Sequence, residues 1–186
     1  MKFKALFIVA LMLLMAGCSG GGGLKPDTLS KEDLCIAKDD DSKSKVCFGM
    51  SRADAEKVLG TGVKEMYDKY DYGVSVIYRD GKTVSVIILD ADSKNVYSTI
   101  RGLKSGDSKE TVLKLYGDKY PIMRETEPHT VDYVYDLKNK KFIGEVSFKN
   151  IDRNSYKDHL FFSAEYKDDQ VKRIYISDLQ GVMMLN

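Results

Sequence analysis

The sequence predicts an α+β fold in which short helices pack on one face of an antiparallel sheet. Two segments, residues 49–60 and 106–117, space their apolar residues as an amphipathic helix does. Pairs of segments that alternate apolar and polar residues follow each helix, and the polar turns between them favour β-hairpins. A helix and a sheet each have an apolar face to bury, so packing the two together is the simplest arrangement.

The first 17 residues are typical of an export signal. Lys2 and Lys4 precede an uninterrupted apolar run at residues 5–16, which is shorter than the roughly 20 residues that span a bilayer as a helix. Residues 15–18, Met-Ala-Gly-Cys, resemble the lipobox of bacterial lipoproteins. This resemblance implies a signal peptide at residues 1–17 and a palmitate-type lipid on Cys18. An ordinary secretory signal with a chance cysteine is the alternative.

The residues after the signal predict a tethered domain. A lipid with more than one chain anchors a protein stably, so we expect Cys18 to hold the protein on a bacterial envelope membrane. In a Gram-negative cell this is the outer membrane. Four glycines at residues 20–23 favour a flexible chain, and residues 18–33 are predicted to be the lipidated cysteine and its tether. Residues 34–100 and 101–186 are then the two units of the folded part.

The composition restricts the class of partner. The formal net charge is +1, from 29 Lys and Arg against 28 Asp and Glu. Balanced charge argues against a nucleic-acid partner, which requires a basic surface. A hydrophobic content of 43% is ordinary for a folded domain and too high for a disordered chain.

The two cysteines that remain after Cys18 are Cys35 and Cys47. Each lies in a short apolar stretch, and the polar residues 38–45 separate them. In an exported chain this pattern predicts a disulfide across the base of two strands or a turn. A redox-active pair is the alternative, but the spacing is not Cys-x-x-Cys.

The two helical segments repeat one pattern 57 residues apart. Four of their twelve aligned positions are identical, which indicates two tandem repeats of a helix followed by antiparallel strands. Ser51 is expected to cap the first helix, and Ser108 or Asp107 the second. A glycine at the end of each segment, Gly60 or Gly117, favours termination there.

The predicted strands form three hairpins. Their residues are 74–78 with 84–89, 131–137 with 142–148, and 160–166 with 171–176. Asp80-Gly81 in the first turn is a strong hairpin signal. Strict alternation would place Val84, Val86 and Ile88 on one face of their strand, and Val131, Tyr133 and Tyr135 on one face of theirs.

The start of the first helical segment carries a family resemblance. Phe48-Gly49-Met50-Ser51, Ala55 and Val58-Leu59-Gly60 resemble the helix-opening motif of the β-lactamase-inhibitor-protein-like fold, which small envelope lipoproteins of the SmpA/OmlA type share. The tandem copy makes residues 47–176 more similar to the two-repeat inhibitors. The resemblance implies inhibition of a β-lactamase or related cell-wall enzyme, with Asp80 as a carboxylate mimic of substrate. Turn chemistry alone also explains Asp80.

The sequence favours a non-enzymatic protein. His129 and His159 are its only histidines, and neither belongs to a recognised catalytic motif. The acidic runs at 39–41 and 90–95 lack the glycine of a calcium loop, so we expect no metal and no cofactor. An envelope hydrolase that uses dispersed acids stays an alternative.

Aromatic residues in the strands point instead to binding. The candidate contact residues are Tyr133, Tyr135, Phe161, Phe162, Tyr166 and Tyr175. Aromatic residues also suit a buried core, but the adjacent Phe161 and Phe162 must point to opposite faces of a regular strand. We therefore predict that the sheet face without helices binds another envelope protein or a peptide.

Overall fold

A computed structural model describes residues 24–144 and 150–185. The predicted signal peptide, Cys18 and the glycine run lie outside these residues, as do residues 145–149 of the second predicted hairpin. Within the described ranges, no helix is both long enough and apolar enough to cross a bilayer.

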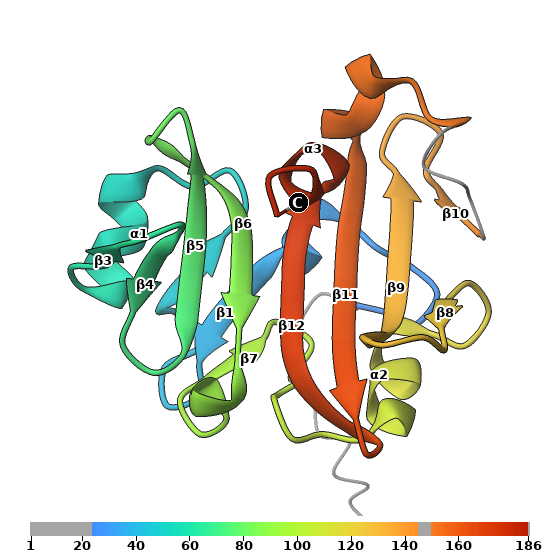
Figure 1. Cartoon of the computed structure of the whole chain (residues 1–186), viewed down its shortest axis with the longest axis horizontal. Helices are drawn as coiled ribbons and strands as arrows, with labels where there is room; N and C mark the ends of the chain where they lie inside the picture. Colours follow the sequence, from blue (N-terminus) through green and yellow to red (C-terminus); the bar gives the residue numbers. More distant parts are fainter. Residues whose placement is uncertain (1–23, 145–149, 186) are drawn as a thin grey trace, which may run out of the picture.

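The described residues form an α+β structure with two antiparallel sheets (Figure 1). The nine strands of the large sheet run in the order β10-β9-β11-β12-β6-β5-β4-β3, with β8 paired to β9, and the small sheet runs β2-β1-β7. The large sheet contains β3 (Val63–Lys64), β4 (Asp68–Tyr70), β5 (Val74–Arg79), β6 (Thr83–Leu89), β8 (Ile122–Arg124), β9 (His129–Asp136), β10 (Lys141–Ile143), β11 (His159–Lys167) and β12 (Gln170–Asp178). The small sheet contains β1 (Cys35–Lys38), β2 (Lys45–Cys47) and β7 (Tyr97–Thr99).

Both predicted helices form, and they begin and end alike. α1 (Arg52–Leu59) is capped by Ser51, whose hydroxyl accepts from the backbone N–H of Asp54. α2 (Lys109–Tyr116) is capped by Ser108, which accepts from the N–H of Thr111, so Ser108 rather than Asp107 is the N-cap. The residues that follow, Gly60 and Gly117, have φ of 85° and 108°, a backbone conformation that favours glycine.

α1, α2 and the small sheet pack on the same face of the large sheet. Ala55 and Tyr116 from the helices and Ile36 from β1 are buried in one cluster with strand residues such as Ile87 and Phe162. The 3-10 helix η4 (Arg153–Asp158) and the short α3 (Leu179–Val182) contribute instead to a second cluster on the opposite face, so the prediction that helices pack on one face only was wrong. We call this opposite face the open face; it is toward the viewer in Figure 1, with α3 in front of the strands.

A β-bulge corrects the predicted facing of β6. Val84 pairs with Tyr78 and Val86 with Ile77, so Ser85 has no partner in β5 and the two-residue period shifts there. Val84, Ile87 and Leu89 consequently face the main core, whereas Val86 and Ile88 do not. The prediction that Val84, Val86 and Ile88 share a face was wrong. Val131, Tyr133 and Tyr135 do share a face, since no bulge interrupts β9.

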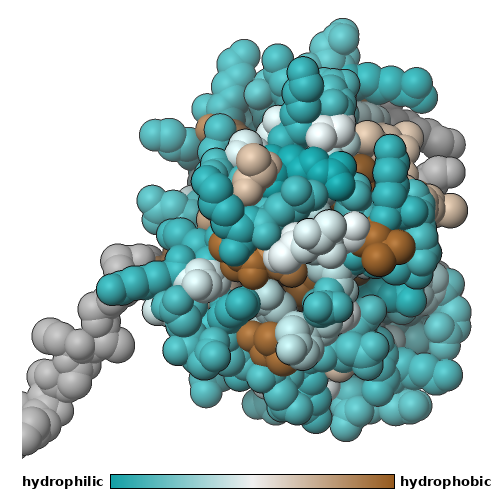
Figure 2. Space-filling model, turned by 90° about the vertical axis from the view of Figure 1, so that its left-hand side faces the viewer, coloured by the Kyte–Doolittle hydropathy of each residue, from teal (hydrophilic) through white to brown (hydrophobic). Residues whose placement is uncertain are grey.

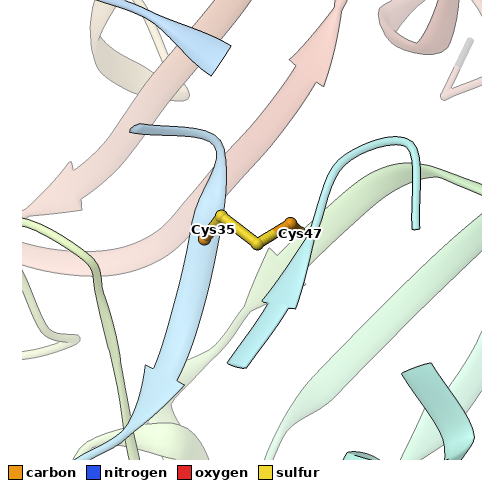
Figure 3. The surroundings of a disulfide bond; sticks show 2 residues. All are labelled: Cys35 and Cys47. Carbon is orange, nitrogen blue, oxygen red and sulfur yellow. A yellow bond between two sulfur atoms is a disulfide. The ribbon is translucent and has the colours of Figure 1, made fainter. Parts of the chain in front are cut away.

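The predicted disulfide between Cys35 and Cys47 is confirmed (Figure 3). The two cysteines are directly opposite in the antiparallel pair of β1 and β2, with their Cα atoms 4.0 Å apart. The hairpin of β11 and β12 is also confirmed. Of the second predicted hairpin, the described part pairs β9 with the three residues of β10.

Candidate functional site: a groove on the open face

A groove of about 670 Å³ crosses the open face of the large sheet. Its lining comes from strands in both halves of the chain, from η4, and from the C-terminal residues. The lining residues are Met66, Tyr67, Lys69, Ser75, Ile88, Asp90, Arg124, Pro128, Thr130, Asp132, Tyr156, Phe161, Ser163, Glu165, Arg173, Tyr175, Leu179, Val182, Met183 and Leu185.

The floor of the groove is one row of residues that runs across the strands. Each member is directly opposite the next in the sheet register, and in order they are Asp132, Ser163, Tyr175, Ile88, Ser75 and Lys69. Neighbouring strands are about 4.8 Å apart, so the row is about 24 Å long. An extended peptide of about seven residues has this length.

The C-terminal segment supplies an apolar wall. Leu179, Val182, Met183 and Leu185 line the groove beside the buried rings of Tyr156 and Phe161. Gly181 explains how closely this segment approaches the sheet, because a Cβ there would come within 2.1 Å of the Ser177 hydroxyl.

An ion pair fixes the position of this wall. Asp178 is fully buried and accepts a hydrogen bond from the Gly181 N–H at 2.7 Å. Arg79 Nη2, from β5, lies 3.0 Å from both oxygens of the same carboxylate and also donates to Ser85 Oγ. A buried carboxylate therefore connects the C-terminal segment to the first half of the chain.

Charged residues line the rest of the groove, with the carboxylates deep and the arginines near the rim. The side chain of Asp132 is 3% exposed and that of Glu165 is 23% exposed, against 49% for Arg124 and 54% for Arg173. Ser163 donates to Asp132 Oδ1 at 2.6 Å, and Arg124 Nε lies 3.0 Å from Oδ2. The deep part of the groove is thus acidic.

Burial raises the pKa of Asp132 above its usual range. Hydrogen bonds from Ser163 and Arg124, together with the charge of Arg124, act in the opposite direction without cancelling the effect of burial. The surroundings of this carboxylate therefore leave its negative charge only partly compensated.

Most of the predicted contact residues lie on the other face. Tyr133 and Phe162 are fully buried in the main core, Tyr166 is buried there, and Tyr135 packs against the same cluster. These four face α1, α2 and the small sheet, so they contribute no surface to the open face. Phe161 and Tyr175 do line the groove, because adjacent residues of a strand point to opposite faces.

Asp80 and the two histidines lie outside the groove. Asp80 is exposed at the turn between β5 and β6, where its φ of 53° and that of Gly81 at 67° fit a tight hairpin turn. His129 and His159 are the first residues of β9 and β11. Across residues 24–144 and 150–185, no three His, Cys, Asp or Glu side chains are grouped to hold a metal ion.

Sequence reasoning missed the polar residues of the groove. Asp132 occupies the position between Val131 and Tyr133, so the alternation in β9 was a signal that it faces away from the aromatic side. The alternation did not show that this side is hollowed, since the wall comes from residues 179–185.

Comparisons with protein-family models, with curated proteins and with solved structures found no match for the chain.

Proposed function

We propose that the protein is a lipid-anchored module of the bacterial cell envelope that binds another envelope protein or a peptide without catalysing a reaction. The observation that carries this proposal is the groove, which combines an apolar wall, aromatic rings and deep carboxylates on the face away from α1 and α2. Ligand sites are typically hollows of this size with a few converging polar groups.

The anchoring part of the proposal rests on residues 1–18. If Cys18 carries lipid, the Cys18→Ser protein should lose labelling by a fatty-acid analogue in growing cells, while the wild-type protein is labelled. Labelling of the variant at the wild-type level would contradict the anchor.

We also propose that the chain consists of two tandem repeats. Two sets of equivalent hydrogen bonds support this: Gly49 N donates to Val84 O at 2.8 Å, and Gly106 N donates to Val171 O at 2.8 Å. The cation of Arg52 lies 4.7 Å from the Tyr78 ring centroid, and that of Lys109 lies 4.9 Å from the Tyr166 ring centroid. Gly49 and Arg52 have the same positions relative to α1 as Gly106 and Lys109 have relative to α2.

The pairing of β6 with β12 supports the same proposal. Ile88 is opposite Tyr175, and the flanking pairs are Ile87 with Ile176 and Leu89 with Ile174. Ile88 follows Val84 by four residues and Tyr175 follows Val171 by four, so the pairing places equivalent residues opposite one another, as an approximate two-fold axis requires. The groove would then straddle the junction between the repeats.

This two-unit arrangement favours a second candidate function, inhibition of a β-lactamase or related cell-wall enzyme, which the family resemblance implies. A direct assay tests it. Purified protein should slow hydrolysis of a β-lactam by a β-lactamase in a dose-dependent way, and an Asp80→Ala variant should be weaker. Unchanged hydrolysis across a panel of such enzymes would reject the inhibitor function.

Site-specific crosslinking in intact cells tests the groove. A photoreactive residue at position 75, on the floor, should form an adduct with an envelope protein or peptide. Position 53 is the matched control, because Ala53 is also small and is exposed on α1. The side of the molecule with α1, β3 and β4 is mostly hydrophilic, with a few hydrophobic residues (Figure 2). Adducts at neither position, or equally at both, would contradict binding in the groove.

A further inference from the structure

We infer that the groove selects a basic side chain, a lysine or an arginine of an extended peptide segment, and holds its charged head between Asp132 and Glu165. This inference rests on the proposed peptide-binding function and specifies the chemistry of the partner. It follows from the placement of charge, of aromatic rings and of the two carboxylates.

The placement of charge makes the end of the floor around Asp132 attractive to a cation, whereas Lys69 lies at the opposite end of the row. The carboxylates of Asp132 and Glu165 lie deep, while Arg124 and Arg173 are about half exposed at the rim. A charge inside a hollow with low-dielectric walls acts more strongly than the same charge in water. The acidic groups therefore determine what the deep part of the groove accepts.

The two carboxylates are placed to share one cation. Asp132 is directly opposite Ser163 in the sheet, and Glu165 follows Ser163 by two residues on the same face. Diagonal neighbours of this kind are about 7 to 8 Å apart. An ammonium or guanidinium group between them reaches an oxygen of each.

Aromatic rings surround this position. Tyr175 is the neighbour of Ser163 on β12, and its hydroxyl donates to Glu165 Oε2 at 3.1 Å. Phe161 precedes Ser163 by two residues on the same face of β11 and also lines the groove. Long basic side chains pack their methylenes on apolar surface and their charges on aromatic rings, and this surface offers both.

The arginines at the rim leave room for a second cation. Arg124 contacts one oxygen of Asp132, and the nearest distance from Arg173 Nη1 to Glu165 is 3.9 Å. The Arg173–Glu165 pair is long and half-exposed, so an entering cation displaces it at small cost, whereas at the buried Asp132 the cation competes directly with Arg124. The raised pKa of Asp132 agrees with this, because it reports a negative charge that the surroundings only partly compensate.

Binding of four seven-residue peptides to the purified protein tests the inference. The peptides share apolar flanking residues and differ only at the centre, which is Lys, Arg, Gln or Glu. We expect the Lys and Arg peptides to bind about tenfold or more tightly than the Gln peptide, and the Glu peptide to bind most weakly. Asp132→Asn should reduce this preference, because it removes one of the two carboxylates that hold the cation.

Two further variants keep the test decisive. Glu165→Gln should reduce the preference in the same direction, and it replaces Asp132→Asn if that variant does not fold. Asp54→Asn, which changes an exposed acid on α1, should retain the wild-type preference. Equal binding of the four peptides, binding of none, or an undiminished preference in both groove variants overturns the inference.

The crosslink from position 75 separates this inference from the proposed function. An adduct that persists in the Asp132→Asn protein, together with peptide binding that ignores charge, keeps the groove as a binding site and rejects the basic side chain. If the protein with the photoreactive residue at position 75 and no other change forms no adduct, both the inference and the proposed function are rejected.

Discussion

Arg101 donates from Nε to Asp33 across a sequence separation of 68 residues, and both side chains are almost completely buried. The same guanidinium donates to the carbonyl oxygens of Lys25, Thr28 and Leu115. Residues 24–33 belong to the predicted tether, yet this contact holds them against the end of α2, and Leu29 among them is buried.

We expect Arg101→Ala to lower the free energy of unfolding by roughly 3 to 5 kcal/mol, because it leaves the Asp33 carboxylate buried and unpaired. Urea unfolding of the purified protein measures this. The double variant Arg101→Met with Asp33→Leu should lose less than Arg101→Ala alone, since no charge then stays buried. A larger loss in the double variant would contradict the account.

The two helix-ending glycines should respond differently to substitution. Gly60→Ala places a side chain at a positive φ with open space around it, and should cost about 1 to 3 kcal/mol. Gly117→Ala adds a clash, because its Cβ would come within 2.2 Å of Asp27 Oδ1 and 2.5 Å of Asp27 N. Melting temperatures of the two variants compare the costs, and equal values would contradict the close contact with residue 27.

Phe161 and Phe162 provide a matched pair that tests the two faces of β11. Phe162 stacks on Tyr116 with ring centroids 3.8 Å apart in the main core, so Phe162→Ala should cost about 3 to 5 kcal/mol. Phe161→Ala should cost less, because its ring packs in the smaller second cluster beside the groove rather than in the main core. Chemical denaturation distinguishes the two, and a greater loss at Phe161 would reverse the assignment of faces.

Asp132 should make stability rise as the pH falls. Its pKa is raised in the folded protein, whereas in the unfolded chain it is near the ordinary value of 3.8. The folded state therefore binds more protons between these two values, and this group favours folding increasingly as the pH falls through that interval. The free energy of unfolding of the wild type, relative to Asp132→Asn, should grow as the pH falls through the raised pKa toward 3.8. A constant difference would contradict the raised pKa.

Loss of the disulfide should lower the free energy of unfolding by about 3 kcal/mol. This is the conformational entropy that closing a short loop removes from the unfolded chain, expressed as a free energy. Replacing both Cys35 and Cys47 by Ala and measuring urea unfolding gives the cost. Reducing agent should shift the wild-type midpoint to a similar extent and leave that of the double variant unchanged. A shift in the double variant would indicate an effect of the reductant on another part of the protein.

Local signals predicted much of the fold. The serine caps, the terminal glycines, the Asp-Gly turn and the cysteine pair each depend on a few neighbouring residues, and each is where the sequence predicts it. The bulge at Ser85 was not predictable in this way. It depends on how β5 pairs with β6, and a single unpaired residue changes which side chains face the core.

The sequence by itself determined the helices α1 and α2, the hairpins of β5 with β6 and of β11 with β12, and the opposite orientation of Phe161 and Phe162, because these follow from backbone geometry over short distances. Tertiary structure alone decided which face of the sheet is covered and where the groove lies. Alternation defines two faces but does not say which of them α1, α2 and the small sheet will bury. The groove also needs Arg79 and Asp178, which are 99 residues apart and meet only when the sheet is complete.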